Sequence, residues 1–224
     1  TSFSDAASII HKYGLQVPEA VSERFRDGVR GRIAETPKPG DPIFKHVDNF
    51  IIANNRLLID AAQEKARELS FRTLILGTEV EGEAKDIGRF FGAIAREICR
   101  SGNPIEPPAC ILAAGETTVT VRGHGLGGRN QEMALAWAIS MSAGPASSQS
   151  CFASVASDGT DGPTTAAGGL VDPFTCARAV DLGLIPPQYL RSNDSSNFLK
   201  ATGDLIVTGP TQTNLMDLQI LLVG

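Results

Sequence analysis

The sequence predicts an α/β protein with three layers, α/β/α, built on a mixed and mostly parallel sheet. From about residue 50 onward, short apolar runs alternate with amphipathic helical segments, as expected for strands joined by helices that cover both faces of a sheet. Most of these runs are apolar at nearly every position, which is typical of strands buried on both faces. Two closely spaced pairs of runs, at 110–121 and near the C-terminus, indicate some antiparallel pairing.

The elements before this region are helical. Residues 4–13 predict a short amphipathic helix, because Ala7, Ile10 and Tyr13 recur at helical spacing. Residues 18–28 predict a second helix, with Pro in its first turn and Gly at its end. Three prolines then fall within residues 37–42 and break regular structure. We therefore expect a loop or an interdomain linker there.

The elements after the linker follow in regular order. Helices are expected where apolar residues recur at helical spacing, at 57–69, 86–99, 133–141, 177–182 and around 197–200. Strands are expected at the short apolar runs, at 50–53, 73–77, 110–113, 117–121, 152–156, 205–207 and 218–223.

Composition excludes several classes of function. The formal net charge of −5 leaves no broad basic field for nucleic acid. No run approaches the ~18 consecutive apolar residues of a membrane-spanning helix. The sequence contains no CxxC, HExxH or GxSxG pattern, which argues against a Cys/His zinc site and a Ser-His-Asp hydrolase.

A glycine-rich segment before the helix at 133–141 is the first candidate site. Residues 123–128 fit the spacing GxGxxG between a strand and a helix. A dinucleotide-binding fingerprint also needs an acidic residue about 20 positions on. No Asp or Glu occurs between Glu132 and Asp158, so the sequence argues against a nicotinamide site.

The same segment suits the binding of an anion. The backbone N–H groups of Gly127 and Gly128 lie at the expected helix N-terminus, next to the guanidinium of Arg129. Oriented amides, the helix dipole and a guanidinium all favour negative charge. The alternative is a tight turn capped by Asn130, with Arg129 in a surface ion pair.

An acidic loop after the expected strand at 152–156 is the second candidate site. Asp158 and Asp161 lie three residues apart between glycines. Two such carboxylates can hold Mg²⁺ through oxygen or act as a base. They can equally form Asx turns that satisfy loop amides, and the sequence leaves both interpretations open.

Together these motifs resemble a known family. The MOFRL domain, which is the C-terminal domain of the two-domain glycerate 2-kinases, carries similar motifs in the same order; here they lie at residues 115–121, 127–132, 157–164 and 208–211. The stretches at 35–42 and 80–84 also resemble this family, so the resemblance runs essentially end to end. It places the MOFRL core at about 105–224. The closing residues look more like an animal enzyme than a bacterial one.

The resemblance implies an activity and a set of site residues. It implies transfer of the γ-phosphate of ATP to the 2-hydroxyl of D-glycerate, with Mg²⁺, in a cleft between two α/β domains. The family's proposed catalytic Lys and Asp belong to its N-terminal domain, and its catalytic Arg falls on Arg129. The other residues implied to contact substrate or phosphate are Glu116, Gly127, Gly128, Asn130, Asp158 and Asp161, of which Asp158 and Asp161 would also hold the metal.

The resemblance also sets the expected domains. The chain starts at Thr1 without an initiator Met, at a point that corresponds to the end of the family's N-terminal domain. We therefore expect residues 1–44 to be the C-terminal tail of that upstream α/β domain plus the proline-rich linker, and residues 45–224 to be an α/β domain. The missing N-terminal domain would then be a partner of this chain, and these 224 residues alone would be inactive.

Two other functions remain open at this point. Some bacterial members of the family are named hydroxypyruvate reductase, which would require NADH or NADPH. A non-catalytic ligand-binding module is the other. The four cysteines lie in apolar segments without a disulfide pattern, which predicts a reducing compartment, either cytoplasm or mitochondrial matrix.

Overall fold

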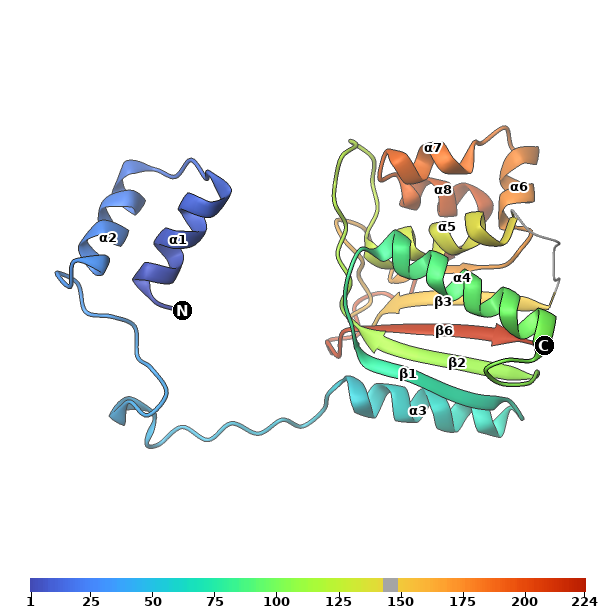
Figure 1. Ribbon diagram of the computed structural model, residues 1–224, viewed down its shortest axis with the longest axis horizontal. Coiled ribbons are helices and arrows are strands. Elements are labelled where there is room, and N and C mark those ends of the chain that lie inside the picture. The colour runs from blue at the N-terminus through green and yellow to red at the C-terminus, as the bar shows by residue number, and fades with distance from the viewer. Residues whose placement is uncertain (143–148) are drawn as a thin grey trace. The chain divides into compact units, whose positions relative to one another are not determined.

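The computed structural model of the protein describes residues 1–142 and 149–224 (Figure 1). These residues divide into two compact units, residues 1–51 and residues 52–224.

The first unit is a pair of helices followed by an irregular segment. It contains α1 (Phe3–Tyr13), α2 (Glu19–Val29) and a short 3-10 turn, η1 (Pro42–Phe44). Ser2 caps α1, because its Oγ accepts a hydrogen bond from the N–H of Asp5 at 3.1 Å while the Asp5 carboxylate accepts one from the N–H of Ser2 at 2.7 Å. Both helices expected from the sequence are confirmed.

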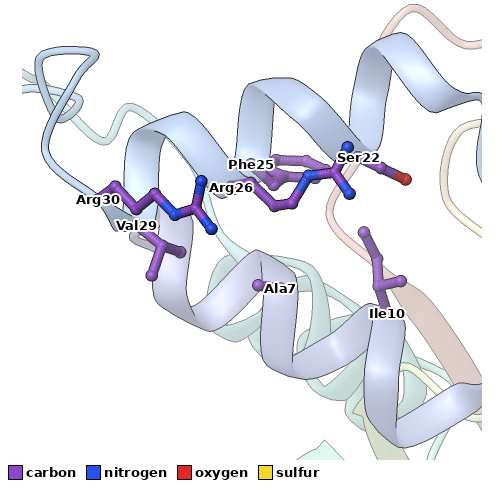
Figure 2. A pocket seen from close by; sticks show the side chains of 7 residues that line it. All are labelled: Ala7, Ile10, Ser22, Phe25, Arg26, Val29 and Arg30. Atoms are coloured by element: carbon purple, nitrogen blue, oxygen red, sulfur yellow. The ribbon is translucent and has the colours of Figure 1, made fainter.

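An apolar hollow of about 300 Å³ lies between α1 and α2. Figure 2 shows side chains from both helices around it, among them Ala7 and Ile10 of α1 and Phe25 and Val29 of α2. Neither helix has a fully buried residue. The apolar faces of the two helices therefore remain largely uncovered within this unit.

The second unit contains six strands and six helices among its described residues. In chain order they are α3 (Asn55–Glu68), β1 (Arg72–Val80), α4 (Ala84–Ser101), β2 (Ala109–Gly115), α5 (Arg129–Ser142), β3 (Ser150–Ala156), β4 (Gly168–Val171), α6 (Thr175–Asp181), α7 (Pro186–Arg191), α8 (Ser195–Thr202), β5 (Leu205–Ile206) and β6 (Asp217–Val223).

The sheet has the strand order β1-β2-β6-β3-β4-β5. The α/β class and the mixed sheet are confirmed, but the expected predominance of parallel pairing is wrong. Only β1 and β2 pair in parallel within the described sheet, and the other four neighbouring pairs are antiparallel. The physical reason is that β6, the last strand, inserts between β2 and β3 and runs against both.

The helices cover both faces of the sheet, as Figure 1 shows. α3 packs on one face, where Ile59 and Leu112 belong to one apolar core. α4 and α5 pack on the other face, over a larger core that contains Phe91, Trp137 and Phe152. α6, α7 and α8 gather beside α5. The expected three layers are therefore present, with one helix on the first face.

Two expected strands are not formed. Phe50, Ile51 and Ile52 are 83%, 85% and 94% exposed and belong to no strand, because an apolar run becomes a strand only where a partner strand accepts its hydrogen bonds. Residues 117–121 form a single parallel bridge, between Thr118 and Glu83. None of the described helices is long and apolar enough to cross a lipid bilayer.

Candidate functional site

One edge of the sheet brings together most of the segments that the sequence singled out. β1, β2 and β3 end there, and β6 begins there, because Asp217 pairs with both Gly115 and Ala156. The loops 116–128, 157–167 and 207–216 therefore leave the sheet at the same edge (Figure 1). Ligands in open α/β sheets bind outside the carboxyl ends of strands, which makes this edge the candidate site.

Arg129 is held at this edge by Asp217. Its Nε and Nη2 donate to the two carboxylate oxygens of Asp217 at 2.6 and 2.9 Å. Asp217 is completely buried, whereas the Arg129 side chain is 25% exposed. These hydrogen bonds raise the pKa of Arg129 above its ordinary value, and burial raises the pKa of Asp217 against the opposing effect of Arg129. Asp217 therefore orients the guanidinium of Arg129 and accepts hydrogen bonds from only part of it.

The other edge of the Arg129 guanidinium is available to a ligand. A guanidinium carries five N–H donors, and Asp217 takes one from Nε and one from Nη2. Nη1 donates to no group in the described part of the chain. Glu116 lies nearby, with its Oε1 3.5 Å from Nη2 and its side chain 57% exposed. Arg129 can therefore bind a carboxylate or a phosphate through Nη1 and Nη2, beside an exposed acid.

Asp161 is buried and caps helix α5. Its Oδ1 accepts from the backbone N–H and the Nδ2 of Asn130, both at 3.2 Å. Its Oδ2 accepts from the backbone N–H and the Nε2 of Gln131, at 2.9 and 3.0 Å. The carboxylate thus satisfies the first backbone N–H groups of α5. The anion at this helix N-terminus is one of the protein's own side chains.

Within the acidic loop, Asp161 does not fit the expected role of a magnesium ligand. Asp161 is completely buried with four N–H donors on its two oxygens, which leaves it no lone pair facing solvent. Asp158 accepts from the N–H and O–H of Thr160 through Oδ1, the Asx turn that the sequence left open. Among residues 1–142 and 149–224, no three His, Cys, Asp or Glu side chains gather as a metal site.

Asn130 lies behind the site rather than in it. It is completely buried, and its Oδ1 accepts a hydrogen bond from the Oγ of Ser154 at 2.6 Å. Its two N–H groups point to Asp161. The expected direct contact of Asn130 with substrate or phosphate therefore does not fit the geometry. Asn130 instead ties α5 to β3.

The glycines before α5 are packed against neighbouring segments. A Cβ on Gly128 would collide with the Asp161 carboxylate, and a Cβ on Gly127 would collide with the Oγ of Ser195. The backbone N–H groups of Gly127 and Gly128 reach no acceptor within the described residues. Both amides that the sequence suggests for anion binding are therefore free to donate to a ligand.

Sequence reasoning missed three polar residues that organise this region. Asp217 is the first residue of the last strand, and the antiparallel pairing of β6 with β2 brings it to Arg129. Asn193 donates to the Oε2 of Glu132 at 2.9 Å. Glu132 is 2% exposed and its Oε1 has no partner in the described residues, so burial raises its pKa. The sequence signal that could have identified Asp217 is its place immediately before the apolar run at 218–223.

Comparison with known proteins gives the chain its relatives. Residues 109–217 match the MOFRL family. The whole chain is 40% identical to the glycerate 2-kinase of Pyrococcus horikoshii, over 226 residues that make up 50% of that protein. It is 41% identical to the D-glycerate 2-kinase of Thermotoga maritima, with 98% of this chain and 49% of the relative covered. The crystal structure of glycerate kinase from Thermotoga maritima superposes with a TM-score of 0.78 at 38% identity, covering 100% of this chain and 51% of the other.

Two expectations change with these comparisons. The human glycerate kinase is 31% identical, which is less than the archaeal and bacterial relatives above, so the expected animal source has no support. A relative from Agrobacterium vitis named putative hydroxypyruvate reductase is 38% identical. The two relatives named glycerate 2-kinase are more similar to this chain, at 40% and 41% identity.

The matches relate this chain to about half of a glycerate kinase. The chain spans about half the length of the curated relatives it matches, and the match covers the chain from end to end. Residues 109–217 therefore match the MOFRL family model, within a chain that is similar over its whole length to about half of a glycerate kinase.

Proposed function

We propose that this chain is the C-terminal half of a glycerate 2-kinase, which transfers the γ-phosphate of ATP to the 2-hydroxyl of D-glycerate and yields 2-phosphoglycerate. The observation that carries the proposal is Arg129, which Asp217 holds at the sheet edge and whose Nη1 donates to no group in the described part of the chain. About 40% identity to two glycerate 2-kinases along the whole chain supports the same reaction.

The proposed roles follow from exposure and geometry. Arg129 binds an anionic oxygen, either of the glycerate carboxylate or of the transferring phosphoryl group, through Nη1 and Nη2. The N–H groups of Gly127 and Gly128 bind a second anionic oxygen beside it. Glu116, which is exposed next to Arg129, accepts a hydrogen bond from a substrate hydroxyl. Asp161 and Asp217 act through others, because they are completely buried.

The chemical step needs positioning and charge neutralisation more than covalent catalysis. The 2-hydroxyl oxygen of glycerate forms a bond to the γ-phosphorus, and the bond from that phosphorus to the bridging oxygen breaks. ADP leaves with the bridging oxygen and its electron pair. The hydroxyl proton passes to a base that we assign to the remaining half of the protein, together with the family's Lys and Asp.

Magnesium enters this proposal with the nucleotide. Mg²⁺ bound to ATP usually keeps several waters and needs only one or two protein carboxylates. Asp161 offers no oxygen to it, for the reason given above. We therefore write the co-substrate as ATP·Mg and assign no resident metal to the acidic loop.

The split of the site has a consequence for the chain alone. Because the base, the Lys and the Asp belong to the other half in this proposal, the 224 residues alone do not turn over D-glycerate. A reductase remains the second candidate, carried by the name of two relatives. A ligand-binding module is what the chain would be in isolation. The predicted compartment, cytoplasm or mitochondrial matrix, stays a prediction.

The test is identification of the product. The protein that carries this chain is incubated with D-glycerate and ATP·Mg, and the phosphorus NMR spectrum is recorded. We expect the resonance of 2-phosphoglycerate to grow with that of ADP. Formation of 3-phosphoglycerate would contradict the position of transfer. Oxidation of NADH by hydroxypyruvate, without phosphoryl transfer, would replace the proposal with the reductase.

A further inference from the structure

A small cavity away from Arg129 is surrounded by positive charge. It has a volume of about 180 Å³ and lies between the start of α4, the loop at 120–122 and the turn between α7 and α8. Its lining includes four cationic side chains, namely Lys85, Arg89, Arg122 and Arg191. The chain as a whole carries a net charge of −5, so this cluster has the opposite sign to the net charge of the protein.

Two of the four cations have no acidic partner in the described part of the chain. Lys85 pairs with Glu83 at 2.9 Å, and Arg89 pairs with Asp86 at 2.8 Å. Arg122 and Arg191 form no ion pair within the described residues. A concave site lined by one sign of charge concentrates counter-ions. Arg122 and Arg191 therefore leave the lining with more cationic than acidic groups, which favours an anion.

The position of Arg122 is fixed by Asn193. The Oδ1 of Asn193 accepts hydrogen bonds from the N–H groups of Arg122 and Gly123, at 2.8 and 3.0 Å. Gly123 permits this approach, because a Cβ there would collide with the carbonyl of Ser192. Asn193 itself has a φ of 54°, a left-handed conformation that is uncommon outside glycine. Hydrogen bonds to Asn193 thus hold the backbone of the loop at Arg122 near Arg191 in the absence of ligand. Such preorganisation favours binding.

The cavity is connected to the Arg129 site by one short segment. Glu116 lies beside Arg129, and Thr120 and Arg122 line the cavity. Six residues separate Glu116 from Arg122, and an extended chain spans at most about 3.6 Å per residue. The Cα atoms of Glu116 and Arg122 are therefore within about 22 Å of each other.

The size of the cavity limits what it can hold. Pockets that enclose a whole drug-sized ligand measure roughly 300–1,000 Å³, and this cavity is smaller. It suits a phosphate group or two, with the rest of the ligand outside. Guanidinium groups are matched to phosphate oxygens in shape and charge.

We propose that the cavity between Arg122 and Arg191 binds the phosphate chain of the nucleoside triphosphate. This assignment rests on the proposed kinase function. Arg122 and Arg191 neutralise phosphate oxygens, Lys85 and Arg89 add charge from α4, and the nucleoside lies outside the cavity. A free polyphosphate has the same chemistry, so the experiment uses both ligands.

The experiment measures binding by titration calorimetry at fixed ionic strength, with inorganic tripolyphosphate and with ATP. The test variant is Arg122→Ala/Arg191→Ala. The control is Arg56→Ala/Arg100→Ala, which makes the same change in net charge at arginines that are 60% and 77% exposed. Each charge-assisted hydrogen bond contributes about a tenfold change or more. We expect affinity for both ligands to fall roughly 100-fold in the test variant and to stay unchanged in the control.

Three results would overturn the assignment. The first is no binding of tripolyphosphate to the wild-type protein. The second is equal losses in the test and control variants. The third is a loss of tripolyphosphate binding with unchanged affinity for ATP, which would make the cavity a site for a separate polyanion. Failure of the proposed function looks different: ATP binding then depends on Arg122 and Arg191, but no phosphate reaches D-glycerate.

Discussion

Burial decides which charged residues at the sheet edge can meet a ligand. Asp161 and Asp217 are completely buried. The carboxylate oxygens of Asp161 accept hydrogen bonds from the start of α5, and those of Asp217 accept hydrogen bonds from Arg129. Glu116 is 57% exposed and Arg129 is 25% exposed. A buried carboxylate with matched donors acts by holding other groups in place. In the proposed site, the groups left to bind a ligand are therefore Arg129, Glu116 and the neighbouring glycine amides.

Glu132 supplies a prediction at the scale of one residue. Burial raises its pKa, so the folded state holds the proton more tightly than the unfolded state. Its favourable contribution to stability is then fully present below the unfolded pKa of about 4.3, and it is lost as the pH rises through the higher folded pKa. Glu132→Gln keeps a side-chain acceptor for Asn193 and removes the ionisation.

The measurement is the free energy of unfolding in urea at a series of pH values. We expect the variant to gain stability over the wild type as the pH rises, by about 1.4 kcal/mol for each unit by which the pKa is raised. Glu64→Gln, at an exposed position of α3, serves as the control and should follow the wild type. Parallel curves for Glu132→Gln and wild type would contradict the burial argument.

The sequence identified Arg129 correctly as a residue of this edge, because a glycine-rich turn before a helix is a local pattern. It could not identify Asp217, since 88 residues separate the two partners. Their contact depends on β6 entering the middle of the sheet in the antiparallel direction. No local signal distinguishes that direction from a parallel one.

At the scale of elements, the glycine-rich loop is shaped by what packs against it. Gly128 touches the Asp161 carboxylate that caps α5, and Gly162 lies against Gly127. Because Gly128 and Gly162 have no side chains, the glycine-rich loop and the acidic loop can lie in direct contact. The position of Arg129 at the start of α5 depends on this contact.

Gly128→Ala tests that dependence. The added methyl would displace Asp161, and the first turn of α5 would lose its cap. We expect a loss of about 2–4 kcal/mol in the free energy of unfolding, from the lost cap and the unsatisfied N–H groups. Gly77→Ala in β1 is the control, because a Cβ there meets nothing within 4 Å. Equal stability of the two variants in urea would show that the contact is unimportant.

The elements that the sequence predicted well are those with long patterns. The four helices α3, α4, α5 and α8 and the buried runs of β2, β3 and β6 carry many apolar positions at a regular spacing. β4 was missed, because its residues Gly168 and Gly169 have little strand propensity. α7 was missed, because it begins with Pro186 and Pro187. Phe50–Ala53 was predicted wrongly, because apolar character alone does not supply a partner strand.

At the scale of the whole molecule, three distant parts of the chain make the Arg129 site. Glu116 follows β2, Arg129 begins α5 and Asp217 begins β6. The sheet order, with β6 beside β2, brings them together. The chain also spans about half of its relatives, and the proposed reaction assigns the remaining catalytic groups to the other half. The proposed reaction therefore depends on Arg129 acting on substrate.

The most direct test is the kcat/KM for D-glycerate of the Arg129→Ala variant in the protein that carries this chain. Removing Arg129 alone leaves the buried Asp217 unpaired, at a cost of about 3–5 kcal/mol, so Arg129→Ala/Asp217→Asn is measured beside it to relieve that charge. Arg56→Ala is the control. We predict that both Arg129 variants lose at least about 100-fold in kcat/KM, while the double variant unfolds close to the wild type. Unchanged kcat/KM in the folded double variant would contradict the central claim.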